Sequence, residues 1–309
     1  MADLAVMVLT YDEEVHIGRA LRSVASIARE LVVIDSGSTD RTVEIAKGLG
    51  ARVLSHPFVN QARQFQWGLD NAGLSSGWVM RLDADEVIEP DLAAEIERRL
   101  PELPAAVAGV ILNRKHIFMG RWIRHGGRYP MLLLRIWRNG AARVEDRWMD
   151  EHVVLDRGAT VRFKGGFADV SLHDLSHFID KHNRYATREA IEVVMRKYEP
   201  PPFRHASPLT GQARLKRNIK ERIYNALPFP FAALCYLFYR YFLRLGFLDG
   251  VEGLIYHVLQ GGWYRFLVGA KTTEMERLVT PCANRGERLN VLSKIAGFDL
   301  AAGPGHEGS

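Results

Sequence analysis

A short, largely apolar segment that ends abruptly in carboxylates constrains this chain more than any other feature. Residues 78–82 follow Gly77 and suit a buried strand better than a helix, because the run is short and bounded by glycine. Asp83, Asp85 and Glu86 come directly after it, where open α/β sheets place their ligands. Two carboxylates separated by one small residue can reach a single ion and the phosphates around it, and such oxygen donors suit Mg²⁺ or Mn²⁺. The alternative is a solvated acidic turn before the next helix.

Strands and helices alternate along the first part of the chain. Strands are predicted at residues 4–9, 31–34, 52–54 and 78–82, and helices at 14–28, 43–49 and 60–72. These lengths imply right-handed strand–helix–strand units and a mixed, mostly parallel sheet flanked by helices. The predicted fold class is therefore α/β.

Polar residues follow each of these strands, at 10–13, 35–40 and 83–86. Because the carboxyl ends of parallel strands share one edge of a sheet, three polar loops there favour a binding site. A nucleotide suits this edge, since Tyr11 can stack on a base and Asp35 can accept a hydrogen bond from a base N–H. The alternative for Asp35 is a structural turn cap.

Composition and charge limit the possible classes of protein. The chain has 309 residues, of which 47% are hydrophobic, and a net charge of +5, as expected of a globular protein with a sizeable core. Residues 181–250 hold 13 Lys and Arg against 5 Asp and Glu. The basic run at 214–222 can face an anionic membrane, nucleic acid or a phosphorylated substrate, or can be a solvated helix face.

The two cysteines and the N-terminus indicate a reducing compartment. Cys235 and Cys282 lie far apart without a metal-binding spacing, which supports neither a disulfide framework nor a zinc site. The first residues run straight into an apolar strand pattern without a charged leader, so we expect a cytoplasmic location.

Three ordered motifs resemble the N-terminal half of family 2 glycosyltransferases with a GT-A fold. They are Thr-Tyr-Asp-Glu at 10–13, Val-Ile-Asp-Ser-Gly-Ser-Thr-Asp-Arg-Thr at 33–42 and Trp-Val-Met-Arg-Leu-Asp-Ala-Asp-Glu at 78–86. The resemblance covers about residues 4–155 and is closest to the bacterial branch that includes lipopolysaccharide-core glucosyltransferases. Asp12 is a departure, because the family usually carries Asn there.

The resemblance implies a set of donor-binding residues and a metal. The residues that it assigns to the nucleotide sugar are Thr10, Tyr11, Glu13, Asp35, Ser36, Arg63, Asp83 and Asp85. Among them Asp85 is the more direct ligand of Mg²⁺ or Mn²⁺, with Asp83 beside it. Arg63 falls where relatives often place a basic residue, and its alternative is a surface arginine on a helix.

A second acidic cluster, at residues 145–152, contains candidates for the catalytic base. Inverting glycosyl transfer needs a carboxylate to take the proton of the acceptor hydroxyl, and relatives place an acidic residue at this point in the order. We predict Glu151, with Asp150 as its rival, and His152 either orients the carboxylate or approaches the metal. The alternative is a charged hairpin turn before a strand at 153–155.

Other polar segments have two interpretations each. The aromatic and basic loop at 118–130 suits acceptor binding, or is an ordered connection between strands. His173 and His177 share a helix face at a metal-ligand spacing, within a His-rich segment that related enzymes also carry. They contact substrate phosphate or the active-site metal, or they are structural.

The most apolar part of the chain, at 231–247, contains Arg240 and Arg244. It is too short and too charged for a spanning helix. Its aromatic residues with flanking Lys and Arg are typical of an interfacial helix on anionic lipid, and core or dimer packing is the alternative.

Together these features predict three parts and one activity. Residues 1–165 form the catalytic domain, 166–280 a helical, basic and amphipathic extension that meets acceptor and membrane, and 281–309 a partly disordered tail. The predicted protein transfers sugar from a nucleotide-diphosphate sugar to a lipid-linked or lipopolysaccharide-type glycan. It lies on the inner face of the cytoplasmic membrane, binds no nucleic acid and can form a homo-oligomer. The alternatives are a sugar-1-phosphate nucleotidyltransferase and a non-catalytic glycan-binding protein of the membrane surface.

Overall fold

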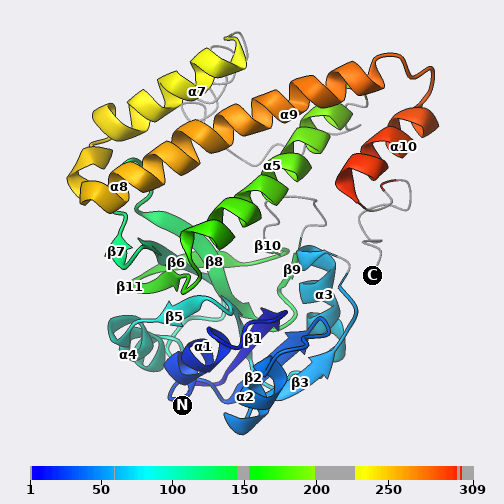
Figure 1. Ribbon diagram of the computed structural model, residues 1–309. Coiled ribbons are helices and arrows are strands. Elements are labelled where there is room, and N and C mark those ends of the chain that lie inside the picture. Colours follow the sequence, from blue (N-terminus) through cyan, green and yellow to red (C-terminus); the bar gives the residue numbers. More distant parts are fainter. Residues whose placement is uncertain (1, 59, 145–152, 199–226, 298–299, 301–309) are drawn as a thin grey trace. The chain divides into compact units, whose positions relative to one another are not determined.

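A computed structural model describes residues 2–58, 60–144, 153–198, 227–297 and 300, which Figure 1 shows as a ribbon. The chain divides into two compact units, the first ending at His173 and the second beginning at Asp174. The predicted boundary between residues 165 and 166 falls inside the last strand of the first unit. That strand carries no sequence pattern that predicted it.

The first unit is built on one mixed sheet covered by helices. Its strands are β1 (Leu4–Thr10), β2 (Glu30–Asp35), β3 (Arg52–Ser55), β4 (Trp78–Asp83), β5 (Glu86–Ile88), β6 (Val107–Phe118), β7 (Arg121–Trp122), β8 (Met131–Arg138), β9 (Ala142–Val144), β10 (Val153–Leu155) and β11 (Ala159–Val170). Its helices are α1 (Ile17–Val24), α2 (Thr42–Gly48), α3 (Gln61–Asn71) and α4 (Pro90–Arg99). Within the described residues the large sheet has the order β3-β2-β1-β4-β8-β6-β11-β5, with β7 paired to β6, and β9 pairs with β10 separately.

Parallel pairing prevails in this sheet. The pairs β3–β2, β2–β1, β1–β4 and β6–β11 are parallel. Strand β8 runs antiparallel to β4 and β6, and β5 runs antiparallel to β11. Four of the seven pairings along the described path are therefore parallel, which confirms the predicted mixed, mostly parallel α/β sheet.

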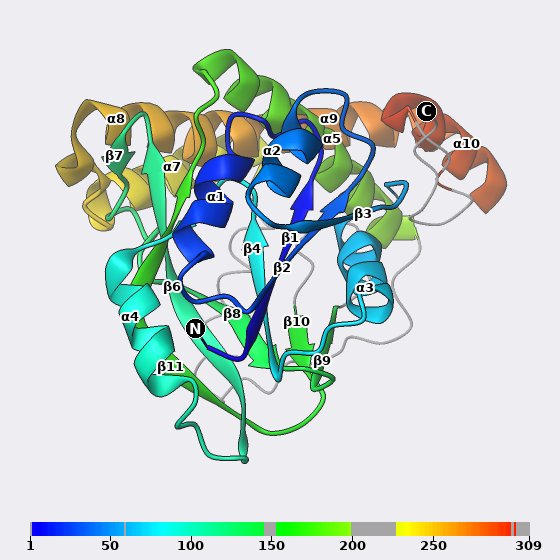
Figure 2. The same ribbon diagram turned by 90° about the horizontal axis from the view of Figure 1, so that it is seen from below.

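Alternating side chains along β1 enter two apolar cores, one on each face of the sheet. Val6 and Val8 pack with buried residues of α1, α2 and α4, whereas Met7 packs with Phe65 of α3. Figure 2 shows these helices around the sheet from below. Because both faces are covered, β1 is a nearly continuous apolar run rather than an alternating one.

The carboxyl ends of β1, β2 and β4 lie at the same edge of the sheet. In the register of the parallel pairs, Thr10 is opposite Asp35 and Leu9 is opposite Asp83. The predicted gathering of the three polar loops at one edge is confirmed. This edge carries the candidate site.

Two unpredicted strands, β5 and β11, lie beside the acidic loop. Strand β11 pairs with β5 on one side and β6 on the other, and it bulges between Arg162 and Gly166. The carboxylate of Glu95 on α4 accepts hydrogen bonds from the N–H groups of Lys164 and Gly165, both at 2.8 Å. Glu95 therefore holds the bulge, and the polar and glycine residues of the bulge hide the strand pattern.

The second unit is helical over its described residues. It contains α5 (Leu175–Tyr198), α7 (Phe229–Phe238), the π-helical turn η1 (Tyr239–Leu243), the 3₁₀ turn η2 (Gly246–Asp249), α8 (Gly250–His257), the π-helical turn η3 (Val258–Trp263), α9 (Tyr264–Val279) and α10 (Arg285–Ala296). Ala190 and Val194 of α5 pack with Met275 of α9 and Leu292 of α10. The predicted helical extension is confirmed.

Two details of this extension differ from the sequence prediction. The apolar segment at 231–247 is not one helix, because α7 ends at Phe238 and the chain turns at Leu245, which has a left-handed φ of 59°. Helix α10 lies within the segment 281–309 that was predicted as a tail, and its Leu289 and Leu292 are buried.

Several predictions fall outside the described residues. They concern Asp150, Glu151 and His152, the basic run at 214–222 and the tail from residue 301.

Candidate active site

The carboxylate of Asp35 organises the loop after β2. Its Oδ2 accepts hydrogen bonds from the N–H groups of Gly37 and Ser38, both at 3.0 Å, and its Oδ1 accepts one from the Ser38 hydroxyl at 2.5 Å. Gly37 has a φ of 92°, a conformation that favours glycine. Asp35 therefore caps this turn, as the alternative interpretation proposed, and its contact with a nucleoside stays a prediction.

Thr10 places an unused hydroxyl at the same edge. The residue is buried, and its Oγ1 has no hydrogen-bond partner among the described residues. A buried polar group without a partner costs about 1–3 kcal/mol, so a ligand that bonds this oxygen gains affinity. Tyr11 is 58% exposed, which leaves its ring open for stacking. Ser36 is less available, because its hydroxyl accepts a hydrogen bond from Gln64.

Asp12 explains why a departure from the family pattern is tolerated. Its φ is 51°, in the left-handed region that Asn and Asp enter more readily than other side chains. Its Oδ1 accepts hydrogen bonds from the N–H groups of Thr39 at 2.7 Å and Asp40 at 3.4 Å. An Asn oxygen can accept the same bonds, so either residue holds the first two polar loops together.

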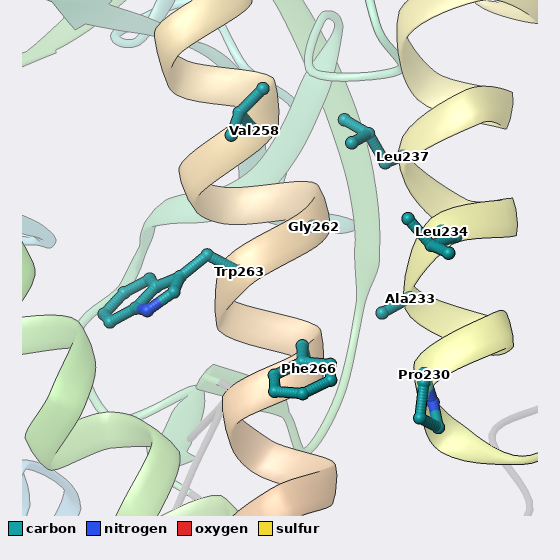
Figure 3. Close-up of a pocket in the computed structure, with 8 residues that line it drawn as sticks. All are labelled: Pro230, Ala233, Leu234, Leu237, Val258, Gly262, Trp263 and Phe266. Atoms are coloured by element: carbon teal, nitrogen blue, oxygen red, sulfur yellow. The ribbon is translucent and has the colours of Figure 1, made fainter.

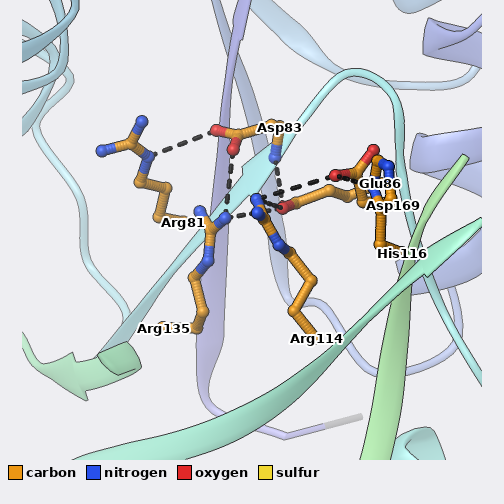
Figure 4. A network of polar contacts seen from close by, with 7 residues as sticks. All are labelled: Arg81, Asp83, Glu86, Arg114, His116, Arg135 and Asp169. Atoms are coloured by element: carbon orange, nitrogen blue, oxygen red, sulfur yellow. Dashed lines mark hydrogen bonds and ion pairs between the residues drawn. The ribbon is translucent and has the colours of Figure 1, made fainter. Parts of the chain in front are cut away.

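Asp83 is held by two arginines (Figure 4). Arg135 Nη2 donates to its Oδ2 at 3.0 Å, and Arg81 Nε donates to its Oδ1 at 3.2 Å. Burial alone would raise the pKa of Asp83, but the charges of Arg135 and Arg81 outweigh it and hold the pKa well below its usual range. Asp83 is therefore ionised, with a hydrogen bond on each oxygen.

Glu86 lies deeper in the same network. Its side chain is 1% exposed, its Oε1 accepts a hydrogen bond from Arg135 Nη2 at 2.6 Å, and its Oε2 accepts the N–H of Asp83 at 3.0 Å. Burial raises the pKa of Glu86 to about 8, although the charge of Arg135 opposes the rise. Burial would also lower the pKa of Arg135, but Glu86 and Asp83 raise it above its usual range. Arg135 is thus the cation that joins the two acids.

The far side of this network comes from β6 and β11. Arg114 Nη1 lies 3.7 Å from Glu86 Oε1 and 3.8 Å from Asp169 Oδ2. His116 Nδ1 lies 3.0 Å from the same Asp169 oxygen. Arg114, Arg135 and Asp169 were not predicted as site residues, although an arginine inside the apolar strand β8 indicates a buried ion pair.

Asp85 differs from Asp83 in its surroundings. It lies in the tight turn between β4 and β5, and its backbone carbonyl accepts the N–H of Val170 at 2.9 Å. Burial of Arg19 lowers the pKa of its guanidinium, and the negative charge of Asp85 partly offsets this effect. Arginines donate a hydrogen bond to each oxygen of Asp83, and the assignment of Asp85 as the direct ligand of a divalent cation stays a prediction.

Glu13, His16 and His173 place possible metal-ligand atoms within 4.8 Å of one another. His16 is buried, its Nδ1 lies 2.6 Å from Glu13 Oε2, and its Nε2 accepts the N–H of Leu172 at 2.8 Å. Because Nε2 is the acceptor, Nδ1 carries the proton and donates it to Glu13. Both ring nitrogens are hydrogen-bonded, so His16 connects the first polar loop with the residues after β11. The ring of His173 packs edge-on against it, with centroids 4.8 Å apart.

The remaining predicted positions lie elsewhere on the first unit. Arg63 is exposed in the first turn of α3, where its N–H bonds the capping side chain of Asn60. In the predicted acceptor loop, Trp122 packs edge-on against Tyr129, with centroids 4.9 Å apart. Lys115 Nζ and the Arg124 guanidinium lie 4.9 and 5.3 Å from the Trp122 ring. This loop is thus an aromatic and cationic surface.

The fold and its polar edge define an α/β protein of the GT-A kind, and a comparison with family models identifies the family. Residues 5–161, about half of the chain, match the model of glycosyl transferase family 2. The chain belongs to this family, and the prediction made from the three motifs is confirmed.

Curated relatives match different parts of the chain. An uncharacterized glycosyltransferase of Rickettsia typhi is 38% identical over 97 residues, 31% of this chain and 32% of that protein. The lipopolysaccharide core biosynthesis glycosyltransferase LpsC of Rhizobium meliloti is 26% identical over 297 residues, 89% of this chain and 93% of that protein. The match thus spans about a third of the rickettsial protein and nearly all of LpsC.

A solved structure with a partial likeness is glucosyl-3-phosphoglycerate synthase of Mycobacterium tuberculosis in complex with Mn²⁺ and UDP-glucose. It is 25% identical over 37% of this chain and 43% of that chain, with a TM-score of 0.30. A TM-score of this size supports no further argument.

Proposed function

We propose that this protein transfers a sugar from a nucleotide-diphosphate sugar to a glycan acceptor, with inversion, in the synthesis of bacterial surface polysaccharide. The observation that carries the proposal is the acidic and arginine network around Asp83, Asp85 and Glu86, at the same sheet edge as Thr10 and Asp35. Membership of glycosyl transferase family 2 supports the reaction class. The similarity to LpsC supports a lipopolysaccharide-type or lipid-linked glycan as acceptor.

The first polar loops are proposed to hold the nucleoside of the donor. Tyr11 offers an exposed ring for stacking, and the buried Thr10 hydroxyl offers a hydrogen bond that no described residue uses. The loop that Asp35 caps lies beside them, and Glu13 keeps its position through His16. Arg63 is proposed to reach the diphosphate from α3.

A divalent cation, Mg²⁺ or Mn²⁺, is proposed to bind at Asp85. When bound, the ion would neutralise charge that grows on the leaving diphosphate. Asp83 keeps its charge through Arg81 and Arg135, and therefore fixes the position of the loop that carries Asp85. We thus assign Asp83 an indirect part in metal binding and Asp85 the direct one.

The acceptor is proposed to bind opposite the donor, near the acidic cluster at 145–152. Glu151, or Asp150 in its place, would take the proton of the acceptor hydroxyl as the new C–O bond forms. This assignment rests on the family resemblance, because both residues lie outside the described part of the chain. The Trp122 and Tyr129 rings with Lys115 suit the packing of sugar rings and the binding of phosphate.

The protein is further proposed to act at the inner face of the cytoplasmic membrane, where a lipid-linked acceptor is held. The exposed apolar residues of the second unit and the excess of basic residues at 181–250 support an anionic membrane surface as partner. Nucleic acid is not expected as a partner, and a homo-oligomer remains compatible with the same surface.

Transfer of radiolabelled sugar from a nucleotide sugar to a glycan acceptor tests the proposal. Asp85→Ala and Glu151→Gln should each lose at least about 100-fold in activity, given the size of general-base and metal effects. Asp70→Asn, which changes an exposed acid of α3, is the matched control and should keep full activity. Full activity in Asp85→Ala would refute the metal role, and full activity in Glu151→Gln would refute the base.

Two further assays separate the two other classes of function. A sugar-1-phosphate nucleotidyltransferase would release pyrophosphate from nucleotide triphosphate and sugar phosphate, and a glycan-binding protein would show no metal-dependent nucleotide binding by calorimetry. Family membership favours the transferase over both.

A further inference from the structure

Residues 229–266 of the second unit form a helical hairpin with apolar side chains on its surface. One limb is α7 with η1, the turn lies at Leu245 and η2, and the other limb is α8 with η3 and the start of α9. Large apolar residues are exposed on both limbs and around the turn, among them Phe231 at 61%, Leu243 at 65% and Val251 at 68%. On α7 the exposed positions 231, 234 and 238 form one stripe, and on α8 and the residue after it so do 251, 254 and 258. Exposed apolar surface of this extent marks an interaction site.

Three of the six Asp, Glu, Arg and His residues of the hairpin are buried, whereas Glu252 and Arg265 are partly buried and Arg244 is exposed. Arg240, Asp249 and His257 are each at most 3% exposed. The Arg240 guanidinium lies 5.6 Å from the ring centres of both Tyr236 and Tyr256. His257 Nε2 lies 4.0 Å from Asp249 Oδ2. Residues 229–266 are all described, and Arg244 is the single exposed Asp, Glu, Lys or Arg among them. This distribution is the reverse of that in a water-soluble helix pair and is typical of helices in lipid.

The backbone at the turn fits the same environment. Arg244 N–H bonds the carbonyl of Tyr239, Leu245 N–H that of Phe242, and Leu248 N–H that of Leu245. In hydrocarbon each unpaired backbone group costs several kcal/mol, so these local bonds make an irregular turn tolerable there. Among the described residues, no single helix is long and apolar enough to cross a membrane. One bent pair, Phe229–Leu243 with Gly246–Val279 at 71°, has the length and composition to enter one.

The two limbs pack closely and leave an apolar groove between them (Figure 3). Gly269 follows the hairpin on α9, and a Cβ added there would lie 2.4 Å from the Phe229 ring, so glycine is required for this approach. Small residues at such contacts are typical of helix packing in membranes. Between the limbs a groove of about 260 Å³ is lined by apolar side chains that include Leu234, Leu237 and Phe266 (Figure 3).

We infer that this hairpin inserts into one leaflet of the bilayer as a re-entrant element, with lipid hydrocarbon chains filling the groove. The inference deepens the proposed membrane location and rests on it. Apolar residues on both limbs and around the turn need a medium that surrounds the hairpin end, which one flat interface with a second copy does not provide. Arg244 has a long side chain that extends to the headgroups from a shallow turn.

Flotation with vesicles tests the insertion in the full chain. With phosphatidylcholine and phosphatidylglycerol vesicles in 1 M NaCl, we expect the wild type to float, because hydrophobic insertion survives screening. The double variant Leu243→Glu/Phe247→Glu should bind at least tenfold less. Val193→Glu, at an exposed apolar position of α5, is the matched control and should float normally. Equal flotation of the double variant, or loss of wild-type binding in high salt, would overturn the inference.

The two native cysteines supply a second measurement that needs no hairpin variant. Cys235 is exposed on α7, whereas Cys282 lies after α9, and both are free thiols. An impermeant maleimide should label Cys235 at least tenfold more slowly when vesicles are added, with Cys282 unchanged. If Cys235 is protected without vesicles and in step with dimer formation in sedimentation velocity, a second copy covers the hairpin and the inference is wrong. Neither readout involves sugar transfer, so an inactive transferase would leave both results unchanged.

Discussion

Asp83 and Asp85 are separated by one residue, and we propose different roles for them, which their Asn variants should distinguish. In Asp83→Asn the charge that faces Arg81 and Arg135 is lost. Each charge-assisted hydrogen bond contributes about 1.5–3 kcal/mol, and Arg135 is only 6% exposed. The Asn oxygen can keep one of the two bonds, and Glu86 still pairs with Arg135. We therefore expect the free energy of unfolding to fall by about 2–3 kcal/mol.

Asp85→Asn should affect metal binding more than stability. The residue lies in the turn and contributes its backbone carbonyl to Val170, a bond that Asn keeps. Its unfolding free energy should fall by less than in Asp83→Asn, by about 1 kcal/mol, because the Asp85 charge that acts on Arg19 and Arg135 is lost. Binding of Mn²⁺ together with a nucleoside diphosphate should be lost, because the proposed direct ligand is gone.

Urea unfolding and calorimetry measure the two effects on the same samples. For the first unit, 2–3 kcal/mol corresponds to a fall in Tm on the order of 5–10 °C. If Asp85→Asn is destabilised as much as Asp83→Asn, the acids share one structural role and the division is wrong. If Asp83→Asn is as stable as the wild type but binds no metal, Asp83 is a direct ligand instead.

Three further predictions follow from single contacts. Glu95→Ala leaves the N–H groups of Lys164 and Gly165 without an acceptor. The free energy of unfolding, measured by urea denaturation, should therefore fall by about 2–4 kcal/mol. A change below about 0.5 kcal/mol would contradict the role of Glu95 in the bulge. Asp12→Asn should change the free energy of unfolding by no more than about 0.5 kcal/mol, because Asn keeps the capping oxygen, whereas Asp12→Ala should lower it by about 1 kcal/mol. Equal melting temperatures of the two variants would refute this. Because the pKa of Glu86 rises from 4.5 to about 8 on folding, folding takes up a proton in this range. The free energy of unfolding should therefore fall as pH rises from about 4.5 to 8. This dependence on pH should flatten in Glu86→Gln, and an unchanged dependence would exclude Glu86 as its source.

The parallel part of the fold could be predicted because local signals agree there. Apolar runs such as β1 and β4 are short and bounded by polar loops or glycine, and the helices between them have clear periodicity. The motif residues Thr10, Asp35 and Asp83 end their strands. Because the carboxyl ends of parallel strands lie at one edge of a sheet, these residues are expected at a common edge. The same reasoning applies to any chain with this alternation.

The arginines and the end of β11 were not predictable in this way. Arg114 and Arg135 become site residues only through pairing of β6 and β8, and Asp169 only through pairing of β6 with β11. Such pairings join residues far apart in sequence, and no local periodicity encodes them. His16 was likewise not predicted as a site residue, although its ring bonds Glu13 in the first polar loop and Leu172 after β11.

The end of β11 connects stability to the site. Just beyond the bulge, Asp169 faces Arg114 and His116, Val170 N–H bonds Asp85, and Leu172 N–H bonds His16. A Cβ on Gly165 would lie 2.5 Å from Cα of Leu92, so the bulge packs against α4 without room for another side chain. Because a slip of one residue would turn Asp169 to the other face of the sheet, the bulge that Glu95 holds sets which side chains reach the acids. Although Glu95 and Gly165 are not among the residues proposed to bind the nucleotide sugar, substitutions at either position should therefore lower metal-dependent nucleotide binding together with stability.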